Sequence, residues 1–142
     1  MEKITAEGVQ KNERHNERKN ESYANLNVDT KRIVFNVYFK DTGGLTYNEY
    51  FQKRIDEGQI STRGQKAGAT IFNELVVDVN TRYFEQHGGY KYAKQFYKEA
   101  YRFACEIYGE NNIVSAVMHA DELNKAVSEG LGKPVYHYHL HI

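Results

Sequence analysis

The stretch VYHYHLHI, residues 135–142, places His137, His139 and His141 at every second position. Alternation with a period of two is typical of a β-strand, so the three imidazoles would face the same side of a sheet. Imidazole rings that point into a protein interior are costly unless their nitrogens find partners. The stretch therefore predicts a strand whose histidine face meets a metal ion, a phosphate or acidic side chains.

A second stretch, NIVSAVMHADE at residues 112–122, predicts another strand with a histidine near its end, His119. If the two strands are neighbours in the sheet, His119 meets two of the later histidines, either His137 and His139 or His139 and His141. Three imidazoles on neighbouring strands predict a divalent-metal site with positions left open for a substrate oxygen. The alternative is a set of surface histidines on an edge strand.

Charged residues elsewhere complement this predicted metal site. Asp121 and Glu122 directly follow His119 and could orient the metal ligands or bind a water molecule. In the run HNERKNESYAN, His15 and Arg18 lie one helical turn apart and could address one phosphate together. Lys66, in a basic loop, could hold another phosphate. A solvated charged face is the alternative interpretation of such a run.

The remaining sequence predicts a mixed fold. We expect strands at residues 33–39, 71–79, 112–119 and 135–142, helices at 46–57, 91–108 and 123–131, and a loop at 61–70. Residues 1–31 are polar and predict a loop or short helix held by contacts to something else. Thr46 followed by Glu49 is typical of a capping box. Because strands and helices mix without strict βαβ alternation, the sequence predicts an α+β domain over residues 1–142, with a largely antiparallel sheet and helices packed on it.

Composition narrows the class of protein. The 142 residues carry 19 basic and 19 acidic side chains, which weighs against nucleic-acid binding through bulk charge but allows a local basic groove. The side chains expected to form that groove are Arg14, Arg18, Lys19, Arg63 and Lys66. No window is apolar enough to span a bilayer. The single cysteine, Cys105, excludes an internal disulfide and predicts a cytoplasmic protein.

Two of these motifs carry a resemblance to a known family. The first runs from His15 through Arg18 to Asp29, and the second is His119-Ala-Asp121-Glu122 with the later histidine strand. The chain resembles the N-terminal nicking domain of MobV-type plasmid mobilisation relaxases, the Mob/Pre or plasmid recombination enzyme group within the HUH endonucleases. On this resemblance we prefer the pair His139 and His141 to the other register, because Leu140 suits the hydrophobic position between them.

The resemblance implies a function and roles for particular residues. Such proteins nick one DNA strand at a plasmid transfer origin, act on it as single-stranded DNA, and stay covalently joined to its 5′ end. His15 would be the nucleophile, forming a phosphohistidine, with Arg18 and Lys66 as fixed cations. Glu122 would accept a proton or position a ligand. The metal ligands would be His119, His139 and His141, holding Mn²⁺ or Mg²⁺.

Two other functions share parts of this pattern. A rolling-circle replication initiator has the histidine pair but attacks with a tyrosine on a helix, although Tyr92, Tyr97 and Tyr101 suggest packing residues. A non-catalytic DNA-binding fragment is the other alternative. Since the full relaxases carry long C-terminal regions, we expect a chain truncated after Ile142, with coupling or relaxosome proteins binding through the missing region.

Overall fold

The computed structural model describes residues 1–142 and contains two antiparallel sheets. The larger sheet has four strands in the order β2 (Val37–Lys40), β5 (Ala116–Leu123), β6 (Tyr136–His141) and β4 (Val76–Asp78). The smaller sheet pairs β1 (Glu2–Thr5) with β3 (Thr70–Glu74). The predicted α+β class with an antiparallel sheet is confirmed.

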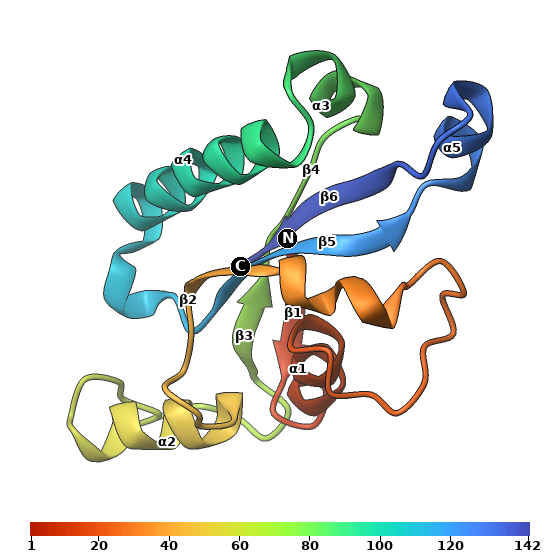
Figure 1. Cartoon of the computed structure of the whole chain (residues 1–142). Helices are drawn as coiled ribbons and strands as arrows, with labels where there is room; N and C mark the ends of the chain where they lie inside the picture. The colour runs from red at the N-terminus through yellow and green to blue at the C-terminus, as the bar shows by residue number, and fades with distance from the viewer.

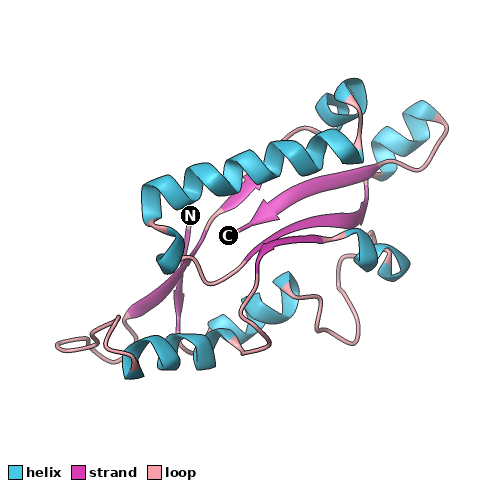
Figure 2. Ribbon diagram, turned by 60° about the vertical axis from the view of Figure 1, so that its left-hand side comes forward, coloured by secondary structure: helices cyan, strands magenta, loops and turns pink.

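Helices lie on both sides of the larger sheet (Figures 1 and 2). Their bounds are α1 (Val9–Asn16), α2 (Tyr47–Asp56), α3 (Thr81–His87), α4 (Tyr90–Tyr108) and α5 (Lys125–Leu131), with 3-10 turns η1 (Thr30–Phe35) and η2 (Glu110–Asn112). The long helix α4 runs along one face of the sheet, whereas α1 lies on the other side (Figure 1). The expectation that helices pack on the sheet is thus met by α4. The second face is partly covered by α1, which is a polar helix.

The central strands β5 and β6 have one apolar and one polar face. Met118 and Ala120 of β5, with Tyr138 and Leu140 of β6, are buried in the core beneath α3 and α4. The intervening residues, including His119 and the β6 histidines, therefore project from the opposite face. Strand alternation thus separates the core from the histidine row.

Helix α4 supplies most of the packing on the apolar face. Ala93, Tyr97 and Ala104 follow helical spacing and are buried, and the Tyr97 hydroxyl donates a 2.7 Å hydrogen bond to the Tyr138 carbonyl. Gly88 and Gly89 both have positive φ, 113° and 62°, which allows the sharp turn from α3 into α4. The predicted helix at 91–108 is confirmed.

Helix α1 is held by polar contacts, as expected for residues 1–31. Glu13 is buried and accepts a hydrogen bond from the Tyr47 backbone N–H at 2.9 Å. Asn12 and Asn16 each donate to the Glu74 carboxylate at 2.9 Å. A helix with one buried apolar residue, Val9, is therefore fixed mainly by hydrogen bonds to α2 and β3.

Two predicted strands were wrong in their extent. Residues 30–35 form η1 instead of a strand, because the Asp29 side chain caps the turn by accepting from the Lys31 N–H, and only Val37–Lys40 is extended. The predicted strand at 71–79 is divided at Leu75 into β3 and β4, which belong to different sheets. Leu75 exchanges two backbone hydrogen bonds with Ile142, at 2.8 and 2.9 Å, so the two sheets meet there.

Other boundaries also differ from the predictions. The predicted strand at 112–119 starts later, at Ala116, and continues past the histidine to Leu123. The predicted helix at 123–131 begins at Lys125, after Asn124 caps it. Strand β1 and helix α3 were not predicted, because each is short and gains its order from neighbours. No helix has both the length and the apolar character needed to cross a membrane.

Candidate metal and nucleophile site

The pairing of β5 with β6 brings two of the predicted ligands face to face. His119 lies directly opposite His139 in the antiparallel register, and His119 Nδ1 is 3.3 Å from His139 Nε2. Burial, with the charge of His141 next, lowers the pKa of His139 to about 2. The same causes lower the pKa of His119 well below 6.5. Both rings are therefore neutral at pH 7 and keep lone pairs available to a metal ion.

The orientation of His119 is fixed from α1. Its Nε2 lies 2.8 Å from the backbone carbonyl of Asn16, which can only accept, so this nitrogen carries the proton. The lone pair is then on Nδ1, the atom that faces His139. A backbone carbonyl that sets the tautomer of a histidine in this way is typical of metal-binding rings.

Glu74 orients His141 in the same manner and was not predicted as a site residue. His141 Nδ1 is 2.9 Å from Glu74 Oε1, and Nε2 is buried without a partner. Burial alone would raise the pKa of Glu74, but hydrogen bonds from His141 and Asn16 outweigh it and lower that pKa. The one sequence signal for this role is a carboxylate within the predicted strand at residues 71–79.

His15 joins this cluster from the last turn of α1. Its ring centroid lies 5.3 Å from that of His141 and 5.7 Å from that of His119. The ring is half-buried and lines a hollow of about 780 Å³ together with Tyr23, Glu74 and His141. Burial, followed by the charges of His141 and Arg18, lowers the pKa of His15 from 6.5, so the imidazole is neutral at pH 7.

Arg18 does not lie on the same helix as His15, although the two are one helical turn apart in the sequence. It follows the C-terminus of α1 with a left-handed φ of 52°, and its side chain is 1% exposed. The guanidinium donates to both oxygens of Asp121 at 2.7 and 2.8 Å, and to Glu122 at 2.8 Å. Arg18 therefore does not share a helical face with His15, because it lies past the end of α1 and turns inward to the acidic pair, although its Nη1 still donates to the His15 carbonyl at 3.3 Å.

A β-bulge explains how one arginine reaches two consecutive carboxylates. In a regular strand Asp121 and Glu122 would point to opposite faces. The register of β5 against β6 shifts between His119 and Glu122, so that Glu122 pairs with His137 and faces the histidine side. Glu122 Oε1 consequently lies 3.7 Å from His139 Nε2 as well as beside Arg18.

Two of the sequence-predicted residues lie apart from the cluster. His137 is held at the edge of the histidine face by Thr81 Oγ1, 2.8 Å from Nδ1, and by Asp78 Oδ1, 3.0 Å from Nε2. Lys66 is exposed in the loop between α2 and β3, which lies away from β5 and β6 (Figure 1), and makes no side-chain hydrogen bond or ion pair.

The donor set fits a divalent metal. Two groups of three side chains bring their ligand atoms within 4.8 Å of one another: His15, His119 and His141, and His119, Glu122 and His139. His139 Nδ1 and His141 Nε2 are buried without hydrogen-bond partners. The predicted trio is thus divided between two overlapping groups that share His119.

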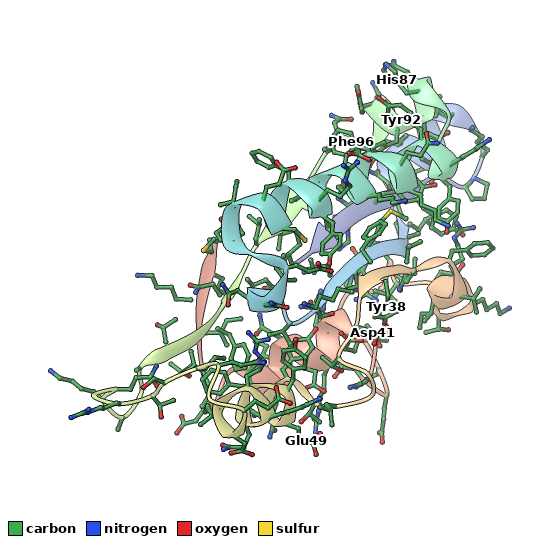
Figure 3. All side chains as sticks on the ribbon, turned by 90° about the vertical axis from the view of Figure 1, so that its left-hand side faces the viewer. Tyr38, Asp41, Glu49, His87, Tyr92 and Phe96 are labelled. Atoms are coloured by element: carbon green, nitrogen blue, oxygen red, sulfur yellow. The ribbon has the colours of Figure 1, made fainter.

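The helical tyrosines expected to be packing residues lie on the face of the sheet opposite the histidines. Tyr92, Tyr97 and Tyr101 belong to α4 and pack against the core, and Tyr92 appears at the α3 end of that helix in Figure 3. The sheet separates them from the histidines. Tyr23 alone among the tyrosines lines the hollow beside His15, and its hydroxyl is buried without a partner.

Solved structures share this fold. A manganese-bound crystal structure of the MobM relaxase domain (MOBV; Mob_Pre) with plasmid pMV158 oriT DNA matches with a TM-score of 0.78. The match has 24% sequence identity and covers 100% of this chain and 67% of that one. A second manganese-bound MobM structure, at pH 4.6, matches with a TM-score of 0.76 and 23% identity.

Sequence comparisons identify relatives more directly. The plasmid recombination enzyme type 2 of Staphylococcus aureus is 32% identical over 122 residues, which cover 86% of this chain and 29% of that protein. A plasmid recombination enzyme of Bacillus sp is 32% identical over 108 residues, or 76% of this chain and 26% of that protein. The chain thus spans less than a third of these relatives. The family model described as "Plasmid recombination enzyme" (Mob_Pre) matches residues 1–142, and the chain therefore belongs to the plasmid recombination enzyme family.

Proposed function

We propose that this chain nicks and rejoins single-stranded DNA at a plasmid transfer origin, with His15 as the nucleophile. The observation that carries the proposal is the position of His15, a neutral, half-buried imidazole beside His119 and His141 at the edge of an open hollow. Family membership supports it, as do the MobM structures, which contain oriT DNA and manganese. This substrate would place the protein in the bacterial cytoplasm.

The proposed chemistry is a phosphoryl transfer to nitrogen. The lone pair of His15 attacks the scissile phosphorus, a P–N bond forms, and the bond to the 3′ oxygen breaks. The leaving oxygen takes a proton and becomes a 3′ hydroxyl, while the 5′ end stays on the protein. In the reverse step a 3′ hydroxyl oxygen attacks the phosphorus, the P–N bond breaks to free His15, and the hydroxyl proton is given up to water, which rejoins the strand.

The histidines opposite His15 supply the metal site of this proposal. His119, His139 and His141 would hold Mn²⁺ or Mg²⁺, with His137 replacing His141 only in the other register. A bound divalent ion would polarise a phosphate oxygen and offset the charge of the transition state. Asn16 and Glu74 hold the His119 and His141 rings in the orientation that such binding requires.

The remaining charged residues would act by positioning. Glu122, 3.7 Å from His139 Nε2, would hold that ring or act as a further ligand. Arg18 fixes Glu122 and Asp121, so its contribution to catalysis would be indirect. Lys66 would contact DNA phosphates outside the cluster.

Mapping the covalent adduct tests the proposal. The chain is incubated with an oligonucleotide that contains the transfer origin and Mn²⁺, and the modified peptide is identified by mass spectrometry. We expect an acid-labile, alkali-stable phosphoramidate on His15. His15→Ala should lose the adduct and still bind the oligonucleotide, because the metal ligands and basic residues remain.

Tyr23→Phe is the matched control, since it removes the one tyrosine hydroxyl in the hollow. The adduct should persist in this variant. An adduct that survives His15→Ala but disappears in Tyr23→Phe would contradict the proposal and favour the tyrosine chemistry of a replication initiator. DNA binding without an adduct in the unmodified chain would favour a non-catalytic fragment.

A further inference from the structure

His15 belongs to one of the two overlapping groups of side chains that could hold a metal ion. One group contains His119, Glu122 and His139, and the other contains His15, His119 and His141. A metal ion that occupied the second group would use the side chain that the proposed reaction needs as its nucleophile. The same nitrogen cannot bind a metal and attack phosphorus, because both uses require its lone pair.

The surroundings of His15 suit a ligand. No side-chain hydrogen bond to a protein group engages either ring nitrogen of His15, and the ring centroid lies 5.7 Å from that of His119 and 5.3 Å from that of His141. Nitrogens that share an ion at bond lengths of about 2.1 Å lie roughly 3 to 4 Å apart. The nitrogens here lie within 4.8 Å, so closure by about 1 Å completes the set.

The position of His15 in the fold allows that small movement. It stands one residue before the end of α1, and the chain leaves the helix through Arg18, whose φ of 52° breaks the helical path. His119 and His141 are each less than a tenth exposed and are held by Asn16 and Glu74. The half-buried His15 is therefore the side chain that can approach or leave a fixed pair.

We propose that His15 is a metal ligand in the DNA-free protein and is released as a nucleophile when a DNA phosphate oxygen replaces it. This inference rests on the proposed function for the release step, whereas the ligand role stands on the side-chain geometry alone. The hollow of about 780 Å³ gives the strand an approach to the cluster from the His15 side. Coordination of His15 to the metal ion would keep the nucleophile unreactive until the DNA strand is bound.

Counting imidazole ligands of Mn²⁺ tests the ligand role. Metal-free protein is loaded with Mn²⁺, and pulsed electron paramagnetic resonance counts the histidine nitrogens coupled to the ion, while calorimetry gives the affinity. His15→Ala should show one coupled imidazole fewer than the unmodified chain and roughly tenfold weaker binding. His87→Ala is the control, since this exposed histidine lies on α3, on the other side of the sheet.

Adding a single-stranded origin oligonucleotide tests the release. The count should fall by one in the unmodified chain and stay constant in His15→Ala. His15→Gln, which keeps a polar side chain, provides a second variant with the same expected counts should the alanine variant melt at a lower temperature. Equal counts and affinities in the unmodified chain and both variants would overturn the ligand role.

Two further outcomes separate this inference from the proposed function. Bound DNA that leaves the count of the unmodified chain unchanged would overturn the release step. A ligand count that behaves as expected, in a chain that never forms a covalent adduct, would leave His15 as a metal ligand and remove its role as nucleophile.

Discussion

Single residues at the histidine face depend on partners brought from distant segments. Arg18 illustrates this, because its buried charge is paired with the carboxylates of Asp121 and Glu122, more than 100 positions later in the chain. A buried charge that loses its partner is strongly unfavourable. The acidic pair and Arg18 therefore form one unit whose integrity positions Glu122 beside His139.

Replacing Arg18 tests how much its ion pairs with Asp121 and Glu122 contribute to the stability of the fold. Arg18→Met keeps the apolar stem and leaves the Asp121 carboxylate with Asn36 as its remaining side-chain partner. We expect the free energy of unfolding to fall by about 3 to 5 kcal/mol, measured by urea denaturation. Arg82→Met, at an exposed arginine, should change it little. Equal stability of the two variants would mean that Arg18 is dispensable for folding.

The two neighbouring histidines of β6 should differ in their effect on metal binding. His139 faces His119 and Glu122, whereas His137 is engaged by Thr81 and Asp78. We expect His139→Ala to abolish Mn²⁺ binding and His137→Ala to retain at least part of it, as measured by calorimetry. Similar losses in both variants would place the ion in the other register.

At the scale of elements, short segments are fixed by caps and by register. The predicted capping box of α2 is confirmed: the Thr46 hydroxyl accepts from the Glu49 N–H at 3.2 Å, and Glu49 accepts from the Thr46 N–H at 2.7 Å. This reciprocal pair satisfies two backbone donors that the first turn leaves free. Helix α2 in turn holds α1 through the contact between Tyr47 and Glu13.

Removing the cap should loosen α2. Thr46→Ala should lower the free energy of unfolding by about 1 kcal/mol in thermal or urea denaturation. The hydrogen bonds from Thr46 lower the pKa of Glu49, so its contribution is present above the ordinary glutamate pKa and is lost as pH falls through the lowered value. In Thr46→Ala, the loss of stability that accompanies the protonation of Glu49 at acidic pH should be smaller than in the unmodified chain. An unchanged acid transition would mean that Glu49 contributes nothing through this cap.

In the whole molecule, one face of the larger sheet forms the hydrophobic core and the other carries the histidine cluster. Helices α3 and α4 cover the apolar face, and α1 lies on the other side of the sheet (Figures 1 and 2), the side from which His119 and the β6 histidines project. Of the basic residues expected in a groove, Arg18 is buried and Lys19 pairs with Glu13 at 2.8 Å. Arg14 lines the hollow beside His15, so DNA binding should depend on that side of the molecule.

The salt dependence of DNA binding tests this division. We expect Arg14→Gln to weaken binding of a single-stranded oligonucleotide and to reduce the slope of log affinity against log salt by roughly 0.7, the value for one released phosphate contact. Fluorescence anisotropy at several salt concentrations measures both. Lys98→Gln, at an exposed lysine of α4 on the opposite face, should change neither. Equal slopes for both variants would move the binding surface elsewhere.

The sequence by itself determined the local features of this protein. Period-two alternation identified β6 and its histidine face, helical spacing identified α4, and Thr46 with Glu49 identified the start of α2. These features depend on neighbours a few residues apart, so composition and spacing are sufficient to find them. The fold class followed from the order of such elements, and the family from two short motifs.

Only the tertiary structure decided which side chains meet. The bulge in β5, the inward turn of Arg18, the anchoring of His141 by Glu74 and the approach of His15 all join segments far apart in the chain. The division of residues 71–79 between two sheets has the same origin. Such contacts depend on strand register and on burial. The cost of burying an unpaired charge or hydrogen-bond donor outweighs the local conformational preferences of the residues. A pattern of neighbouring residues does not encode which distant groups will satisfy that charge or donor.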